Sequence, residues 1–417
     1  MDKATRLRHF RPMRFVGLCL ALLLTACAAA RFDPIGVDND GYAADHPFYA
    51  EYCALSQIKK RPGFGADIRG EIGGHAVFYL NGACRDPASA YPVLILCERG
   101  GAGLSMNEHF RNAKWVATPG LDFFFNGDIQ PGTPVTRQTY AAVQREAHRL
   151  GIYDGIAFHD VVFDDMPKGW SRENWKYEVS AGTDYAIAMA RGRYCARVPL
   201  DRAAMRRMIA FLNAQNAPYR AGKVFHWSVF SDNCIHLAHN ALAAAGLWDV
   251  WPTGRAFIVS LFDFPVPRNE FVNLMRRTND DWLPDPAAVY DDPFARRSLL
   301  EFGTLPTRPG ALALSRPPLR PNDVYDGDLA LIFYDDPLFG HYRSRFDRIF
   351  AQPRTTGALA NRAYFTAQAR QALAAQRPVA DWLARPRYAA DQATFTALYD
   401  RYYALMARLA AGRSTTE

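Results

Sequence analysis

Apolar residues recur at helical spacing after Cys234 and stop at Gly246, which predicts one short amphipathic helix. The apolar positions on its buried face are Ala238, Leu242 and Ala245. The polar residues before it offer Ser231 or Asp232 as the N-cap, which would place the cysteine in the first helical turn. A thiol at that position experiences the positive end of the helix dipole, which favours the thiolate.

Two apolar runs upstream have the length and composition of strands. Residues 67–80 read as a strand or hairpin that includes His75 at the start of its apolar run, and residues 81–82 turn the chain. Residues 91–97 form a second run that ends at Glu98. Residues 48–55 are expected to form a short helix and 122–125 a strand, whereas 139–150 show a helical apolar stripe. The mixture of elements predicts an α+β fold.

The last third of the chain changes character. Residues 304–322 are rich in proline and read as a linker or extended arm, and one strand is expected at 328–334. In the final helix, apolar positions step by three and four: Phe395, Leu398, Tyr402, Leu405 and Leu409. A buried helix face is the simplest explanation, and a partner-binding helix is the alternative.

The first residues are a targeting segment. Five basic residues precede a short apolar run, which is too short to span a bilayer comfortably and which ends in the sequence LTAC at Cys27. This ending resembles the bacterial lipobox, which implies cleavage and lipidation at Cys27. A plain cleaved signal and an uncleaved anchor are the alternatives. By the same resemblance, Ala28 after the cysteine favours the outer membrane, facing the periplasm.

Processing changes what charge and cysteine count imply. The formal charge is +7 for all 417 residues, and residues 1–26 carry five basic and one acidic residue, so the mature chain is near +3. That value gives no reason to expect nucleic-acid binding. An exported chain can form disulfides, and five cysteines remain after Cys27: Cys53, Cys84, Cys97, Cys195 and Cys234. Because five is odd, at least one thiol stays unpaired within the chain, and the pairing is open.

These observations indicate thiol chemistry. Cys234 is the candidate nucleophile, His75 the candidate base, and Glu98 the candidate group that orients the imidazole, because neighbouring antiparallel strands would bring the last two into reach. The simpler explanations are a small buried cysteine, a core histidine and a salt-bridged loop carboxylate. A zinc site made by Cys234, His239 and His75 is a further alternative, but no metal or other cofactor is expected.

The order of these motifs resembles a known family. GH at residues 74–75, an apolar strand ending in a polar residue, and NC at residues 233–234 are similar to the circularly permuted papain-fold hydrolases. Those include permuted NlpC-type peptidases and the lecithin–retinol acyltransferase group. Residues 71–247 resemble the Lnb N-terminal periplasmic domain, a family of uncharacterised function, also through the stretches at residues 101–105, 112–120 and 231–234. The separation of His75 from Cys234 departs from the permuted peptidases, so residues 121–219 would be an insertion.

The resemblance implies a papain-like antiparallel sheet with packed helices, plus a mainly helical C-terminal region. The expected organisation is a signal peptide (1–26), a tether (27–44), a permuted papain-like domain with an insertion (45–265), a connecting segment (266–322) and a helical region (323–417). The expected function is a cysteine-dependent hydrolase or acyltransferase acting on an amide or ester, with cell-wall peptide or lipid as substrate. A noncatalytic binding or assembly lipoprotein, using the C-terminal helices for a protein partner, is the alternative.

Overall fold

The computed structural model describes residues 39–62, 64, 74–253, 266–326 and 342–412. The expected signal peptide, the lipidation site at Cys27 and the strand expected at 328–334 lie outside the described residues. Within the described part of the chain, no helix has the length and apolar character needed to cross a membrane.

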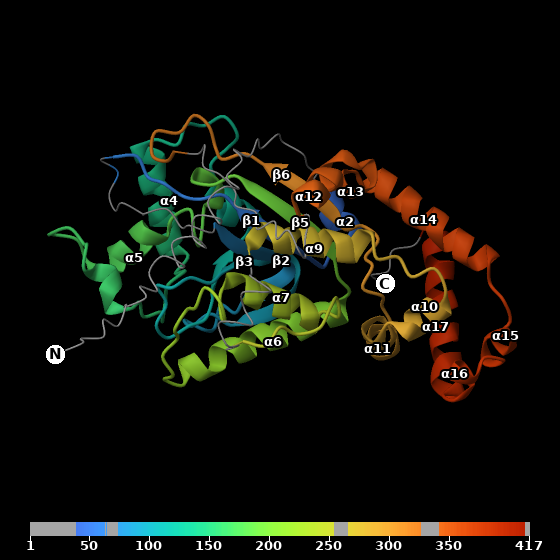
Figure 1. Cartoon of the computed structure of the whole chain (residues 1–417). Coiled ribbons are helices and arrows are strands. Elements are labelled where there is room, and N and C mark those ends of the chain that lie inside the picture. The colour runs from blue at the N-terminus through green and yellow to red at the C-terminus, as the bar shows by residue number, and fades with distance from the viewer. Residues whose placement is uncertain (1–38, 63, 65–73, 254–265, 327–341, 413–417) are drawn as a thin grey trace, which may run out of the picture.

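Within the described ranges, six antiparallel strands form one sheet in the order β4-β3-β2-β1-β5-β6 (Figure 1). The strands are β1 (Tyr49–Leu55), β2 (His75–Arg85), β3 (Leu94–Ser105), β4 (Val116–Pro119), β5 (Arg193–Pro199) and β6 (Leu312–Arg316). Helices cover both faces, so the α+β prediction with an antiparallel sheet is confirmed.

Strand β1 occupies the segment expected to be a short helix, so that prediction is wrong. All seven residues of β1 are buried, because β2 pairs along one side, β5 along the other, and helices cover both faces. A strand buried on both faces shows no alternation of apolar and polar residues, and a short apolar run is then ambiguous. Tertiary pairing decides the conformation of these residues.

Strands β2 and β3 form a long hairpin with a register shift between Asn81 and Ala83. The second expected strand is therefore longer than predicted, since β3 continues through the glycine-rich stretch to Ser105. Gly103 is required there, because a Cβ atom at this position would lie 2.0 Å from the ring of Phe124. The helix that carries Phe124 packs directly on the backbone of β3 for this reason.

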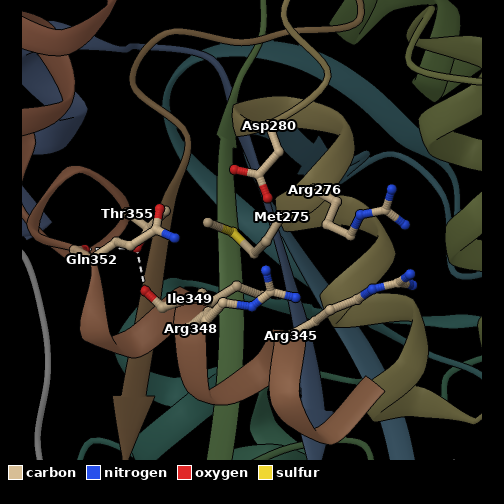
Figure 2. A pocket seen from close by; sticks show the side chains of 8 residues that line it. All are labelled: Met275, Arg276, Asp280, Arg345, Arg348, Ile349, Gln352 and Thr355. Carbon is tan, nitrogen blue, oxygen red and sulfur yellow. Dashed lines mark hydrogen bonds between the residues drawn. The ribbon is translucent and has the colours of Figure 1, made fainter. Parts of the chain in front are cut away.

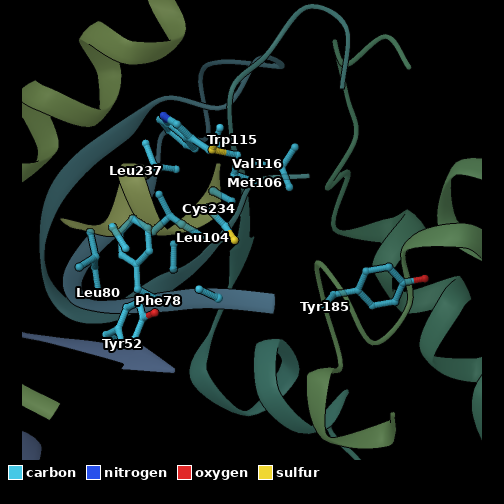
Figure 3. Packing of buried hydrophobic residues seen from close by; sticks show 14 of the residues in the cluster. Tyr52, Phe78, Leu80, Leu104, Met106, Trp115, Val116, Tyr185, Cys234 and Leu237 are labelled. Carbon is cyan, nitrogen blue, oxygen red and sulfur yellow. The ribbon is translucent and has the colours of Figure 1, made fainter. Parts of the chain in front are cut away.

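Three helices cover one face of the sheet: α6 (Arg202–Arg220) on β3, α7 (Cys234–Ala244) on β2, and α9 (Pro267–Asn279) on β1 and β5. Helix α6 is capped by Asp201, whose carboxylate accepts a hydrogen bond from the Ala204 amide at 2.6 Å. Figure 3 shows Cys234 and Leu237 of α7 packed among Phe78 and Leu104 of the sheet.

The opposite face is covered by α3 (Leu121–Asn126), by the short 3-10 helix η3 (Ile187–Met189) and by α2 (Asn39–Asp45). The strand expected at 122–125 is therefore helical, and its three phenylalanines are buried. Helices α4 (Arg137–Arg149) and α5 (Arg172–Ser180), with the 3-10 helix η2 (Asp160–Phe163), lie in the expected insertion. Helix α4 agrees with the predicted apolar stripe within two residues.

The C-terminal half does not divide at the expected boundaries. Strand β6 comes from the proline-rich segment expected to be a linker or extended arm, and it pairs with β5. A second apolar core joins α14 (Ala358–Ala374) and α17 (Gln392–Ala410) to α10 (Pro286–Asp291) and α11 (Pro293–Phe302). The other C-terminal helices are α12 (Tyr342–Ala351), α13 (Pro353–Thr356), α15 (Val379–Leu383) and α16 (Pro386–Ala389). The five apolar positions expected on α17 are buried, which confirms the buried-face explanation.

Candidate active site

Cys234 is the first residue of helix α7, as the sequence predicts, but the N-cap is Asn233. Its side-chain oxygen accepts hydrogen bonds from the amides of Ile235 at 2.9 Å and His236 at 3.2 Å. This cap satisfies two of the first backbone donors of the helix and fixes its start. The cysteine side chain therefore leaves the helix at its positive end, where a thiolate is stabilised.

The four other cysteines in the described part of the chain form two disulfides, Cys53–Cys195 and Cys84–Cys97. The sequence left the pairing open. Cys234 is not part of a disulfide and is 7% exposed. Its electrostatic influence reaches Tyr52 of β1, whose pKa burial raises well above the usual value, with further increases from Glu270 and Cys234. The thiol lies at the start of α7, where Cys234 packs against Phe78 and Leu104 of the sheet.

His75 is the first residue of β2 and is buried. Gly74 before it has a φ of +72°, and a Cβ atom there would lie 2.6 Å from the carbonyl oxygen of Leu55. The backbone of β1 therefore approaches this glycine closely. Nε2 of His75 lies 3.1 Å from the hydroxyl oxygen of Ser105 on β3.

Ser105 connects this imidazole to a buried carboxylate. Its hydroxyl donates to Asp184 Oδ1 at 2.6 Å, and the Thr183 carbonyl oxygen lies 3.2 Å away. The Thr183 carbonyl oxygen can only accept a hydrogen bond, and so can Asp184 when its carboxylate is ionised. The single hydroxyl proton of Ser105 is therefore directed toward these oxygens. Ser105 must then accept from His75, which places a proton on Nε2. In the neutral ring, Nδ1 is consequently the basic nitrogen, as a general base requires.

Asp184 is fully buried and is held by several donors. Asn107 contacts both of its oxygens, at 2.7 and 2.9 Å, and the hydroxyl of Tyr153 lies 2.8 Å from Oδ2. Burial raises the pKa of Asp184 to about 6, while the hydrogen bonds from Ser105, Tyr153 and Asn107 act in the opposite direction. Above that pH the carboxylate is ionised and fixes the direction of the hydrogen bonds that run from His75 through Ser105 to Asp184.

His75 and Cys234 reach the same end of β2 from its two faces. Phe78 and Leu80 point toward α7, and Cys234 follows them in the direction of the strand's start (Figure 3). Tyr79 points to the other face, where its ring centroid lies 6.4 Å from that of Phe124. By alternation His75 shares the face of Tyr79, consistent with its contact to Ser105. The hydrogen bond at Nε2 goes to Ser105.

The structure does not bring Glu98 to His75, so the role predicted for this carboxylate is wrong. Glu98 lies at the register shift opposite Asn81 and Ala83, about 20 Å along the hairpin from His75 at the rise of a strand. Its side chain is 69% exposed and forms an ion pair with Arg202 at 2.7 Å. The simpler explanation is correct in its salt bridge, but Glu98 lies on strand β3 and not in a loop, and its partner Arg202 is on α6.

The zinc alternative does not fit the histidines of α7. Both ring nitrogens of His239 are engaged, Nδ1 with Glu270 at 2.7 Å and Nε2 with the Asp249 carbonyl oxygen at 3.0 Å. The ring is also stacked between Trp248 and Trp251, with centroid distances of 4.3 and 4.0 Å. His239 therefore has a packing role.

One cluster of ligand-type side chains occurs in the described part of the chain: Glu51, Cys53 and Cys195. Because the two sulfur atoms are bonded to each other, this cluster does not offer thiolate ligands.

Sequence reasoning missed Ser105 and Asp184. Ser105 ends the glycine-rich stretch after Glu98, and a strand continuing through those glycines would have placed it near His75 by register. Asp184 comes from the expected insertion and offers no local pattern. No protein-family model, no curated protein and no solved structure matches this chain.

Proposed function

We propose that the protein is an exported, lipid-anchored enzyme that transfers an acyl group through Cys234. The observation that supports this most is the combination of a thiol outside the two disulfides, at the first residue of α7, with an imidazole at the adjacent end of β2 whose protonation is fixed. A nucleophile, a base and a group that orients the base are the three parts such chemistry needs.

In the proposed reaction the Cys234 sulfur attacks the carbonyl carbon of an amide or ester, and its proton passes to Nδ1 of His75. The positive end of the α7 dipole stabilises the oxyanion that forms. The imidazolium then protonates the leaving amine or alcohol, and a thioester remains on Cys234. Water or another acceptor attacks this thioester and regenerates the thiol. Cell-wall peptide, or the acyl groups of lipids or lipoproteins, are the proposed substrates.

The side chains of Cys234 and His75 approach the start of β2 from opposite faces. The proposal therefore requires the thiol proton to be transferred past the first residue of this strand. Hydrogen bonds between catalytic groups are often long without substrate and tighten in the reacting complex. Ser105 and Asp184 hold one side of the imidazole, so the ring keeps its basic nitrogen in place as the thiol approaches.

The low exposure of Cys234 favours a second candidate, a noncatalytic binding lipoprotein that uses the fold as a platform. In that case the helices around the second core, α10, α11 and α14–α17, would carry the surface for a protein partner. The two candidates make opposite predictions about the thiol.

The experiment is alkylation of the folded protein with iodoacetamide across pH, read at Cys234 by peptide mass spectrometry. Fast labelling well below pH 8.5, the usual pKa of a cysteine thiol, that is lost in His75→Ala supports an activated thiol. Cys234→Ala should then abolish turnover of an ester or amide substrate without unfolding the protein. Labelling only after denaturation would overturn the enzyme and favour the binding protein.

A further inference from the structure

A small pocket lies on the α3 side of the sheet, and three of the nine residues that line it are arginines. Arg193 and Arg197 of β5, Arg316 of β6 and Glu51 of β1 line it together with residues of α3. Its volume is about 30 Å³, which is room for a small polyatomic group rather than for a drug-sized ligand.

One of the arginines is neutralised within the protein. Arg197 donates to Glu51 Oε2 from Nε at 2.8 Å and from Nη2 at 2.6 Å, and both side chains are buried. Aromatic rings support the same guanidinium, with Tyr42 at 4.9 Å and Tyr49 at 5.0 Å from its centre. This ion pair uses the only buried carboxylate among the residues that line the pocket.

Arg193 is the second buried arginine of this pocket. It is 7% exposed, and its Nε has no hydrogen-bond partner among the residues that the structure describes. The face of its guanidinium stacks on Phe125 of α3, 4.3 Å from the ring centre, which holds the group in place while its N–H edge remains for hydrogen bonding. A buried donor without an acceptor costs about 1–3 kcal/mol, and more when it is charged.

Burial increases this cost, whereas the surrounding charges act in both directions. Burial is the main reason that the pKa of Arg193 falls to about 10; Glu51 raises it, whereas Arg316 and Arg197 lower it further. Asp122 of α3 also lines the pocket but is exposed, so water screens its charge. The buried arginines thus outnumber the buried carboxylate, and the pocket has an excess of positive charge.

A second arginine-lined pocket shows the contrast. Arg276 of α9 and Arg345 and Arg348 of α12 surround a cavity of about 240 Å³ with Asp280 (Figure 2). None of these three arginines is buried, so water can hydrate their guanidinium groups. A basic surface hollow of this kind needs no ligand to explain it.

We propose that the pocket around Arg193 binds a small oxyanion, a carboxylate or phosphate group, through the guanidinium groups of Arg193 and Arg316. A guanidinium matches the two-oxygen edge of either group and binds it with paired, charge-assisted hydrogen bonds. Such a group would accept a hydrogen bond from Nε of Arg193, which has no acceptor among the described residues. The proposal does not depend on whether Cys234 is catalytic.

The test is thermal unfolding and calorimetric titration of the mature protein with acetate and with inorganic phosphate, against chloride at the same ionic strength. A rise in Tm with either oxyanion, saturating with concentration, is expected. Acetate alone points to a carboxylate ligand, and phosphate alone points to a phosphate group. Equal effects of chloride and both oxyanions would overturn the proposal.

The decisive variant is Arg193→Met, which keeps the apolar stem over Phe125 and removes the donors. It should lose the oxyanion-induced shift, weaken binding at least about tenfold, and unfold no earlier than the wild type without the anion, because an unpartnered buried charge is gone. Arg348→Met, in the hydrated pocket, is the matched control and should keep the shift. If Arg193→Met fails to fold, Arg316→Met replaces it. Retention of the shift in the variant tested would refute the site.

Discussion

The hydroxyl oxygen of Ser105 lies 3.1 Å from Nε2 of His75, and the same hydroxyl donates to Asp184 at 2.6 Å. A buried carboxylate thus sets the protonation of an imidazole that it contacts only through a serine. This arrangement gives Asp184 and Ser105 a positioning role for His75, and it makes the contribution of each residue measurable at Cys234.

Ser105→Ala should slow alkylation of Cys234 in the folded protein. Without the hydroxyl, Nε2 of His75 loses its acceptor, and the imidazole no longer has a fixed basic nitrogen. We expect the rate near neutral pH to fall by at least about tenfold, equivalent to about 1.4 kcal/mol. The measurement is the pH profile of iodoacetamide labelling at Cys234.

Ser298→Ala is the matched control, since Ser298 is also buried and its hydroxyl donates to the Gly246 carbonyl oxygen at 3.0 Å. This variant loses a buried hydrogen bond of similar kind and should label at the wild-type rate. Equal slowing in both variants would indicate a general loss of stability and would contradict the role of Ser105.

Glu98→Gln should leave the labelling profile of Cys234 unchanged. Glu98 is exposed and paired with Arg202, and the hydrogen bond from that arginine is the main reason its pKa is lowered. A lone surface ion pair contributes little to stability. A changed profile in Glu98→Gln would restore the role for Glu98 that the sequence suggested and would contradict the strand register.

Asp184→Asn should remove a pH dependence of stability. The pKa of Asp184 is raised to about 6 in the folded protein, whereas a carboxyl in the unfolded chain titrates near 3.9. Between these values the folded state binds a proton that the unfolded state has released, so the free energy of unfolding falls as pH rises through this range. The fall should be about 3 kcal/mol and complete above pH 6.

The measurement is urea unfolding of the wild type and Asp184→Asn at several pH values from 4 to 7. Other groups titrate in both proteins, so the difference between the two curves isolates Asp184. As pH rises from 4 to 6, the free energy of unfolding of the wild type should fall relative to that of Asp184→Asn. A pH-independent difference would mean that Asp184 titrates normally.

Removing the two disulfides should have unequal effects. Cys53–Cys195 closes a loop of 142 residues, and Cys84–Cys97 closes one of 13. The loop-entropy model gives about 5 kcal/mol for the longer loop and about 3 kcal/mol for the shorter one. Paired substitution of each bridge by alanine, followed by denaturant unfolding, measures both. A larger loss from the hairpin bridge would contradict the entropic account.

Sequence patterns predicted the helices whose apolar stripes and end signals lie within a short stretch of sequence. The helices at α4, α6, α7 and α17 follow apolar stripes with polar or glycine ends, and each was found within a few residues. Strand β1 was misread because it is buried on both faces, where periodicity carries no signal. Strand β6 lies in a segment predicted to be a linker or extended arm because of its prolines, and only pairing with β5 shows that it belongs to the sheet.

The candidate site was predicted in part. The position of Cys234 at a helix start follows from local capping signals, and His75 follows from its place before an apolar run. The position of Ser105 beside His75 depends on the register between β2 and β3. The glycine-rich stretch of β3 gives no pattern from which that register can be predicted. Asp184 reaches Ser105 from a distant segment of irregular structure, so no local pattern could identify it.

The late position of β6 in the chain has a consequence for any shortened form of the protein. Strand β5 is an inner strand only because residues after 310 return to pair with it. A fragment ending at residue 265 would leave the edge of β5 with a row of unpaired backbone donors and acceptors, in a strand whose side chains are all buried in the full chain. Such an edge is a template for association between chains. We therefore expect that fragment to self-associate more strongly than the full chain.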